Sequence, residues 1–366
     1  MKYIDEFRDK KYILALLEEI KKFSSVEASI MEICGTHTHS VSKYGIRGAL
    51  SKNIRLISGP GCPVCVTHQS DIDAIIDFSR NDKTAVIATF GDMLRVPGTF
   101  STLENERALG SDIRIVYSPL AALDIAKENP SKKVLFYSVG FETTAPTVAA
   151  SIIEAKKRNI KNFTVFSLHK LTPPAMKAIL DSGDVLVDGF ICPGHVTAII
   201  GAGAYEFIAK DYGFPCVVSG FEPVDVLYSI YMLLRQLYIG EVKIEIEYDR
   251  VVSKDGNKKA KEIMAAVFEP RDSAWRGLGL IPGSGLKIRP AFAEFDAEQV
   301  FGIKAADSSY VEKPGACACA DVLKGRITPF ECLLFANPCT PEQPMGPCMV
   351  SSEGTCAAYY KYERAS

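Results

Sequence analysis

The stretch KVLFYSVGFETTAPTVAASIIEAKKR, residues 133–158, decides the fold class of this chain. It opens with a short run of aliphatic and aromatic residues, passes through a loop rich in Gly and Thr, and continues as a helical pattern. A short apolar strand followed directly by a helix is typical of βαβ units, in which neighbouring strands pair in parallel. The stretch therefore predicts an α/β protein.

The same alternation continues from residue 26 to residue 238. The other candidate strands are ASIMEIC (28–34), IRLISG (54–59), TAVIATF (84–90), DIRIVYS (112–118), FTVFSLH (163–169), VDGFIC (187–192) and PCVVSGF (215–221). A weak internal repeat sets ISGPGC (57–62) opposite FICPGH (190–195), and ICGTH (33–37) opposite VFSLH (165–169). These patterns predict two similar Rossmann-like parallel-sheet domains, residues 26–134 and 135–240, that face each other across a cleft.

The chain after residue 240 has a different character. Residues 241–268 read as strand, turn and helix, a loop-rich stretch follows, and the final fifty residues hold six cysteines. We expect a third, α+β domain made of residues 241–366 together with the amino-terminal helix, residues 1–25.

Composition and charge exclude two classes of partner, nucleic acids and membranes. The formal net charge of −2 over 366 residues offers no basic surface for nucleic acid, and no apolar run reaches the roughly 18–20 residues of a membrane span. The first residues alternate charged with apolar side chains, which is typical of an amphipathic helix and not of a signal peptide. We therefore expect a cytoplasmic protein with no nucleic-acid or membrane partner. In such a compartment grouped thiols bind metal or carry out redox chemistry more often than they form structural disulfides.

The motif EICGTHTHS, residues 32–40, places Cys34, His37 and His39 within six positions of one another. Thiolate and imidazole are common ligands of zinc, iron and copper, so the motif favours a metal site. Histidines that follow a strand also serve as hydrogen-bonded turn residues, and this alternative stays open.

The motif GPGCPVCVTHQSD, residues 59–71, contains Cys62-x-x-Cys65 on a glycine-rich turn before a helix. A helix amino terminus lowers the pKa of a thiol, so this geometry favours a redox-active dithiol. Half of a metal knuckle or a plain structural turn are the alternatives, although no second C-x-x-C lies nearby.

The carboxy-terminal cysteines form a second group. They are Cys317, Cys319, Cys332, Cys339, Cys348 and Cys356. Four thiolates suffice for a tetrahedral zinc ion or a cubane iron–sulfur cluster, which leaves a pair over. The long, uneven spacings match neither a zinc ribbon nor a bacterial ferredoxin, and they favour an iron–sulfur cluster wrapped by loops, with zinc as the second choice.

A third set of charged and hydroxyl residues follows predicted strand ends. These cleft candidates are Asp92, Arg95, Glu142, Thr143, Thr144, His169 and His195. Carboxyl ends of parallel strands meet at one edge of a sheet, so we expect these residues to line one crevice. Each alone is also typical of a turn or a helix cap.

Several of these motifs, taken in order, resemble the HypD family of [NiFe]-hydrogenase maturation proteins. The motifs are EICGTHTHS, GPGCPVCVT, FGDMLRVPG, GFETTAPT, PGHV and GPCMVSSEGTCAAYY, and the resemblance covers nearly the whole chain. It implies two α/β lobes and a third domain with a [4Fe-4S] cluster. It also implies that the protein joins a HypC-type chaperone to form the scaffold for an Fe(CN)2CO group, with cyanide from a HypE-type donor.

The resemblance also implies roles for individual cysteines. Cys34 corresponds to the proposed ligand of the assembly iron, and Cys62 with Cys65 to the redox-active thiols. By similarity to ferredoxin:thioredoxin reductase, the expected cluster ligands are Cys317, Cys332, Cys339 and Cys356, with Cys319 and Cys348 as an extra dithiol. His37 and His39 would hydrogen-bond cyanide nitrogens, shuttle protons or hold the loop.

Two other functions remain open at this point. One is a stand-alone iron–sulfur thiol–disulfide oxidoreductase, which would need the thiol pairs but not Cys34. The other is a zinc-stabilised interaction protein. In the leading hypothesis the protein is a redox-active assembly scaffold and not a conventional turnover enzyme.

Overall fold

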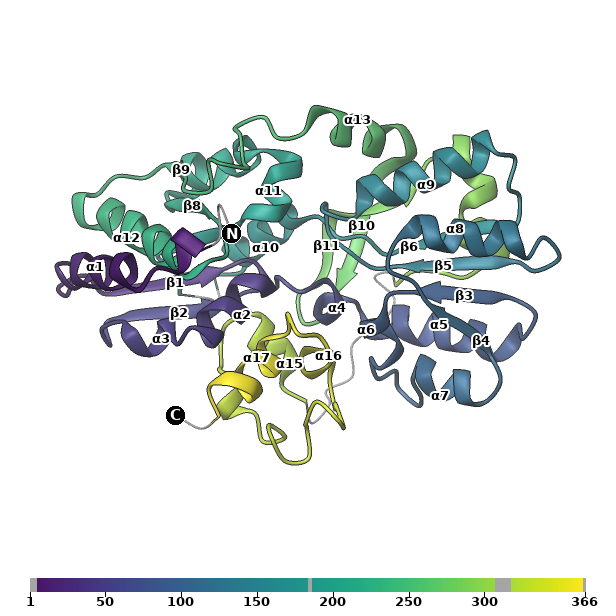
Figure 1. The fold of residues 1–366 in the computed structure, drawn as a ribbon, viewed down its shortest axis with the longest axis horizontal. Helices are drawn as coiled ribbons and strands as arrows, with labels where there is room; N and C mark the ends of the chain where they lie inside the picture. Colours follow the sequence, from purple (N-terminus) through teal and green to yellow (C-terminus); the bar gives the residue numbers. More distant parts are fainter. Residues whose placement is uncertain (1–4, 184–185, 307–316, 365–366) are drawn as a thin grey trace.

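Two parallel β-sheets covered by helices form the two halves of the molecule (Figure 1). The computed structural model describes residues 5–183, 186–306 and 317–364. The first sheet has the strand order β2-β1-β7-β8-β9, with β1 Ala28–Glu32, β2 Ile54–Ser58, β7 Gly189–Pro193, β8 Cys216–Ser219 and β9 Ile244–Ile246. The second has the order β4-β3-β5-β6, with β3 Val86–Thr89, β4 Asp112–Ile115, β5 Val134–Ser138 and β6 Phe163–Ser167. The predicted α/β class with two parallel sheets is confirmed.

The stretch at residues 133–158 forms β5, a loop and helix α9, Ala145–Lys157. Every residue of β5 is buried, and α9 turns Val148 and Ile152 into the same core as Phe136. Burying an aromatic or aliphatic side chain of this size contributes about 1.5–3 kcal/mol relative to leaving it exposed. This helix-on-strand packing is the core of the second lobe.

The strand pairing divides the chain differently from the boundaries that we expected. Strands β1 and β2 lie in the first sheet, β3 to β6 in the second, and β7 to β9 in the first again. The internal repeat would make β6 and β7 the counterparts of β1 and β2, yet β6 and β7 lie in different sheets. A pattern of apolar residues identifies a strand, but the partner of a parallel strand is selected by crossover connections and packing far along the chain.

The amino-terminal helix belongs to the first lobe and not to a third domain. Helix α1, Lys10–Lys21, begins at Asp9, whose carboxylate accepts a hydrogen bond from the Lys11 amide at 2.8 Å. Its apolar face packs on α12, Pro223–Ile239, where Ile20 shares a core with Leu227. An amphipathic helix stabilises whichever apolar surface it covers, and here that surface is a helix of the first sheet.

Residues 241–306 also join the two lobes. After β9, helix α13, Lys258–Val267, packs on α9, and the hairpin of β10, Phe268–Trp275, with β11, Gly279–Ile288, lies between the lobes (Figure 1). Leu286 and Ile288 enter the core of the second lobe, while Trp275 lies in the core that also contains the Cys62 loop.

The carboxy-terminal segment, residues 317–364, is a separate unit of short helices, drawn in yellow in Figure 1. It contains α15 Cys319–Leu323, η5 Pro329–Glu331, α16 Pro347–Val350 and α17 Thr355–Tyr362. Helix α17 packs on α2, Gly35–Lys43, and α16 packs on α4, Pro63–Val66. The segment therefore lies against both motifs that contain the early cysteines.

The remaining helices cover the sheets and connect the strands. They are η1 Asp5–Arg8, α3 Ile46–Ala49, α5 Gln69–Asn81, α6 Gly91–Leu94, α7 Leu103–Ala108, α8 Pro119–Glu128, α10 Thr172–Ser182, α11 Gly194–Ile200, η2 Ala202–Tyr205, η3 Ile208–Tyr212, η4 Pro290–Phe295 and α14 Ala297–Phe301. Among the described residues, no helix combines the length and the apolar character that a membrane crossing requires.

Candidate functional site

Cys34 lies in the loop after β1, at the residue where α2 begins. The neighbouring strand β2 leads into the GPGC loop, and the Gly35 amide donates to the Gly61 carbonyl at 3.0 Å. A Cβ atom on Gly61 would lie 2.5 Å from the backbone of Cys34, so only glycine permits this approach. Two motifs separated by more than twenty residues thus meet at the carboxyl edge of the first sheet, where open parallel sheets bind ligands.

The carboxy-terminal segment supplies an acid to the Cys34 loop. Thr36 Oγ1 donates to Glu353 Oε1 at 2.8 Å, and a Cβ on Gly35 would lie 2.3 Å from the Glu353 carbonyl oxygen. Desolvation, together with the Glu353 carboxylate, raises the pKa of the Cys34 thiol to about 11. Cys34 is therefore a neutral, partly accessible thiol at neutral pH, and binding a cation there would release its proton.

His37 lies fully buried beneath the same loop. Its Nε2 donates to the Gly220 carbonyl at 2.9 Å, and its ring stacks on Phe221 with centroids 4.6 Å apart. His195 stacks on the other side at 4.0 Å, so one phenyl ring lies between two imidazoles. Burial lowers the pKa of His37 to about 4, which keeps it neutral and leaves Nδ1 as an acceptor without a partner among the described residues.

His39, in α2, connects this helix to the carboxy-terminal segment. Its Nδ1 lies 3.2 Å from the Ser352 carbonyl, and its Nε2 lies 3.4 Å from the Tyr362 hydroxyl. Both histidines of the motif therefore hold loops in place through hydrogen bonds.

Cys62 and Cys65 are joined by a disulfide across the first turn of α4. The Cys65 amide donates to Cys62 Sγ at 3.2 Å, and both residues are buried. The carbonyl of Pro347, at the start of α16, lies 3.9 Å from Cys65 Sγ. The disulfide thus faces the carboxy-terminal segment and shares one apolar core with Cys319 and Cys348.

Cys319 and Cys348 are in direct contact. Their Sγ atoms lie 2.7 Å apart, and both residues are buried. Hydrogen bonds from the thiols of Cys317 and Cys348 hold the pKa of Cys319 well below its usual value, and the Arg276 guanidinium adds to this effect. These two residues are the pair that the resemblance set apart from the cluster ligands.

Two of the other four carboxy-terminal cysteines, Cys317 and Cys356, contact this pair. The Cys356 thiol hydrogen-bonds with Cys348, and Cys339 lies within electrostatic reach of Cys356 and Cys332. Within the described part of the chain, no three His, Cys, Asp or Glu side chains are arranged around one ion position. The donor set of four thiols suits an iron–sulfur cluster, whose thiolates surround a core of several atoms and not a single ion.

The cleft candidates of the second lobe have separate roles. Glu142 is buried and accepts from the Thr172 amide at 2.7 Å and its hydroxyl at 3.0 Å, so it caps α10. Burial raises the pKa of Glu142 to about 7 and lowers that of His169, which lies between Ser167 and Ser138, to about 3.

The remaining candidates are divided between the two lobes. Thr143 and Thr144 are partly buried at the start of α9, and Asp92 is exposed after β3. Arg95 donates to the carbonyl of Pro341 in the carboxy-terminal segment. His195 is exposed apart from its contact with Phe221.

Sequence reasoning missed two buried ion pairs that hold these regions together. Lys170 Nζ lies 3.8 Å from Asp71 Oδ2 and donates to Ser273 Oγ and the Ala274 carbonyl, both at 2.7 Å. Burial lowers the pKa of Lys170 to about 8. Lys170 directly follows the predicted strand that ends at His169, but no local pattern distinguishes a buried lysine from an exposed one.

The second pair joins β1 to the carboxy-terminal segment. Arg47 Nη2 donates to the fully buried Glu32 at 3.1 Å, Arg47 Nη1 donates to Glu363, and the guanidinium lies 4.7 Å from the centre of the Tyr359 ring. Arg47 therefore connects the strand that leads to Cys34 with the helix that contains Cys356.

These features define a class: an α/β protein of two parallel-sheet lobes whose cysteines gather where a cysteine-rich segment meets both lobes. The HypD family model, described as the hydrogenase formation hypA family, matches residues 11–363, and the chain belongs to this family.

Curated relatives match over the full chain. The hydrogenase maturation factor HypD2 of Bradyrhizobium diazoefficiens is 46% identical over 374 residues, which covers 100% of this chain and 97% of the relative. The hydrogenase maturation factor HypD of Azotobacter vinelandii has the same identity and coverage. That of Escherichia coli K12 is 42% identical over 372 residues, covering 100% and 99%.

Proposed function

We propose that this hydrogenase maturation factor is the scaffold on which an Fe(CN)2CO group is assembled, together with a HypC-type chaperone and a HypE-type cyanide donor. The iron is cargo, held by Cys34 during assembly. The observation that supports this role most directly is the position of Cys34 beside a second thiol system, since Gly61 contacts its backbone and Cys62 follows Gly61.

Cys34 and the paired cysteines would have different tasks. A low-spin iron with cyanide and carbonyl ligands favours a soft thiolate, and Cys34 is an unpaired thiol that is partly accessible. Its raised pKa keeps it protonated until a cation binds, which limits its loss to oxidation. Thr36 and His37 hold the loop around it through their bonds to Glu353 and Gly220.

The buried thiols would deliver reducing equivalents toward Cys34. The Cys348 sulfur attacks Cys65 while its proton passes to Cys319, the member of the pair with the lowered pKa, and this attack breaks the Cys62–Cys65 bond and releases Cys62 as a thiolate. Attack of Cys319 on Cys348 then closes a Cys319–Cys348 disulfide and releases Cys65. One disulfide is exchanged for another, with two electrons and two protons transferred.

The cluster would be held by Cys317, Cys332, Cys339 and Cys356. When bound, it supplies one-electron chemistry beside the Cys319 and Cys348 thiols. Of the four, Cys339 is buried and the others are partly accessible.

The test is anaerobic purification with a HypC-type chaperone, followed by iron analysis and infrared spectroscopy of the cyanide and carbonyl bands. The scaffold predicts about five irons per chain, four from the cluster and one at Cys34. Cys34→Ala should lose the bands and one iron and keep the cluster absorbance. Equal loss of both signals would contradict this division of tasks.

The disulfide in α4 favours a second candidate, a stand-alone thiol–disulfide oxidoreductase. Such a protein would reduce a substrate disulfide equally well with Cys34→Ala. About four irons per chain without cyanide or carbonyl bands, under any co-expression, would favour it.

A further inference from the structure

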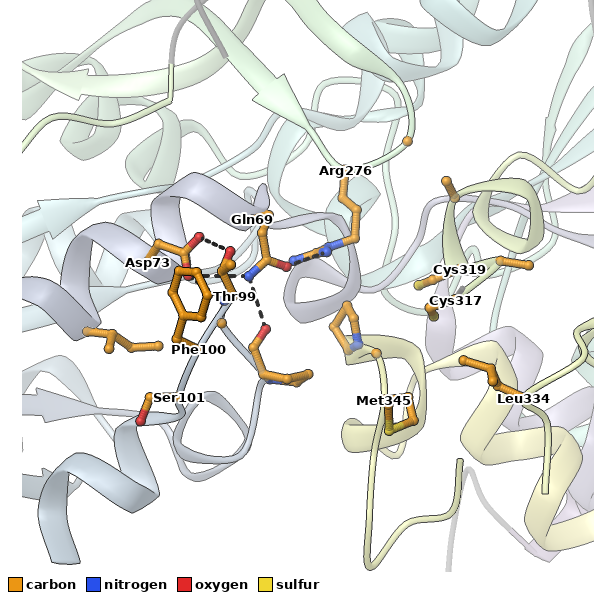
Figure 2. A pocket seen from close by; sticks show the side chains of 18 of the residues that line it. Gln69, Asp73, Thr99, Phe100, Ser101, Arg276, Cys317, Cys319, Leu334 and Met345 are labelled. Atoms are coloured by element: carbon orange, nitrogen blue, oxygen red, sulfur yellow. Dashed lines mark hydrogen bonds between the residues drawn. The ribbon is translucent and has the colours of Figure 1, made fainter. Parts of the chain in front are cut away.

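A groove of about 950 Å³ opens between the second lobe and the carboxy-terminal segment. Figure 2 shows one wall formed by Asp73, Thr99 and Phe100, and the other by Cys317 and Cys319. Cys319 lines the groove, whereas Cys348, its contact partner, does not. The groove therefore reaches the thiol pair from the side of Cys319, which is 5% exposed against 1% for Cys348.

We propose that this groove is the docking site of a protein dithiol reductant, which delivers electrons to the Cys319–Cys348 pair. The proposal rests on the thiol exchange proposed above and gives that exchange a direction. Electrons enter at Cys319, pass to Cys348, and continue to the Cys62–Cys65 disulfide next to Cys34.

The order of the thiols supports this direction. Cys348 follows Pro347, whose carbonyl lies 3.9 Å from Cys65 Sγ, so Cys348 is the inner member of the pair. Cys319 and Cys348 are only 2.7 Å apart at sulfur, against about 2.05 Å for a bonded disulfide, so little movement is needed to close the bond. Of this pair, only Cys319 lines the groove, next to Cys317, which hydrogen-bonds with it.

The wall opposite Cys319 is held rigid by hydrogen bonds. The Asp73 carboxylate accepts from the Thr99 amide at 2.6 Å and from its hydroxyl at 2.7 Å, and Figure 2 draws the bond from the hydroxyl. Arg276 reaches across to Gln69 at 2.9 Å and to the Thr67 carbonyl at 3.1 Å. A preformed wall lowers the ordering cost of docking a partner.

The size and rim of the groove favour a protein over a small thiol. Its volume lies at the upper end of the roughly 300–1,000 Å³ that drug-sized ligands occupy, and a small thiol would fill little of it. Phe100, 90% exposed, and Met345, 45% exposed, stand at the groove as apolar contacts, which are enriched at protein interfaces.

Reduction of the Cys319–Cys348 disulfide by a dithiol needs no further reactant. A thiolate of the reductant attacks Cys319 in the Cys319–Cys348 disulfide, and Cys348 leaves as a thiolate. The second thiol of the reductant then attacks its own mixed-disulfide sulfur and releases Cys319. The reductant ends as a disulfide and the pair as two thiols.

The experiment measures reduction of the full-length protein after mild diamide oxidation. A thioredoxin-class protein with a Cys-x-x-Cys site and dithiothreitol serve as the two reductants, and peptide mapping after alkylation follows each disulfide. Phe100→Asp should slow reduction of Cys319–Cys348 by the protein about tenfold and leave the rate with dithiothreitol unchanged. Tyr117→Asp, at an aromatic residue 93% exposed and outside the groove, should change neither rate.

Two other outcomes would contradict the docking site, and a third would contradict the thiol exchange. Equal rates for Phe100→Asp and the unmodified chain, or reduction by dithiothreitol alone, would overturn the docking site. Reduction of Cys319–Cys348 while Cys62–Cys65 stays oxidised would leave the docking site standing and overturn the proposed exchange toward Cys34.

Discussion

The Cys34 loop and the buried thiol pairs are two cysteine environments with opposite physical properties. Cys34 is a single, partly accessible thiol beside a carboxylate, and its pKa is raised to about 11. Cys65 and Cys348 lie in an apolar core, each next to a second sulfur. A single accessible thiol can bind an ion, whereas paired thiols in a dry core exchange electrons with each other. The environment of each cysteine, and not the number of cysteines, therefore separates the two chemistries.

The largest expected effect is a loss of stability on removing Arg47, which connects β1 to the carboxy-terminal segment. Arg47→Met would leave Glu32 buried without its charged partner, which should lower the free energy of unfolding by about 3 kcal/mol or more at pH 7. Urea titration measures the loss. Burial raises the pKa of Glu32, so the loss should shrink on acidification as Glu32 becomes protonated in the folded state.

The control for Arg47 is the exposed Arg55→Met, which should change stability by less than about 0.5 kcal/mol. Glu32→Gln together with Arg47→Met should recover part of the loss, because no buried charge remains. An Arg47→Met protein as stable as the original would show that this ion pair does not join the regions.

The next effect concerns the contact that places the two motifs side by side. Gly61→Ala would force a Cβ to within 2.5 Å of the Cys34 backbone, and backbone atoms cannot rotate away. We expect a loss of about 3 kcal/mol in the free energy of unfolding, at the upper end for overpacking. Gly48→Ala is the matched control, because nothing lies within 4 Å of its Cβ position. Equal stability of the two variants would contradict the close approach.

Lowering the pH should decrease the free energy of unfolding through protonation of His37. Its folded pKa is about 4, below the value of about 6.5 in an unfolded chain, so the unfolded state binds more protons below pH 6.5. Stability is complete above that pH and falls by about 1.4 kcal/mol per pH unit toward pH 4, or about 2 kcal/mol between pH 7 and pH 5. His37→Gln should remove this part of the slope, as measured by urea unfolding at several pH values. An unchanged slope would show that His37 is not buried in its neutral form.

The smallest expected effect is a change in the alkylation rate of Cys34. Glu353→Gln removes one of the causes of the raised pKa, so alkylation of Cys34 by iodoacetamide at pH 8 should accelerate several-fold. The exposed Glu342→Gln, in the same segment, is the control. In the unmodified chain the rate should rise about tenfold per pH unit up to about pH 11. A rate that levels off near pH 8 would contradict the raised pKa.

Much of the site was predictable because its residues stand in local motifs. The spacing of Cys62-x-x-Cys65, with proline inside and a helix after it, indicated a redox-active dithiol; the two cysteines form a disulfide at the start of α4, and their redox activity stays a prediction. The pairing of Cys319 with Cys348 came from resemblance and not from spacing, since 29 residues separate them. The contact of Phe221 with both His37 and His195 was not predictable, because it joins α2, α11 and the loop after β8, which are distant in the chain.

The strands of the two parallel sheets and the α/β class follow from the sequence alone, since alternation of apolar runs and turn residues is a local property. The hairpin of β10 and β11 does not, because it lies in a stretch that we expected to be loop-rich. The cysteine motifs and their order are likewise present in the linear chain. Three features depend on the three-dimensional packing: β1 and β2 share a sheet with β7 to β9, the amino-terminal helix packs on α12, and the carboxy-terminal segment contacts both cysteine loops. Strand pairing and burial depend on contacts between distant residues, which no local pattern specifies.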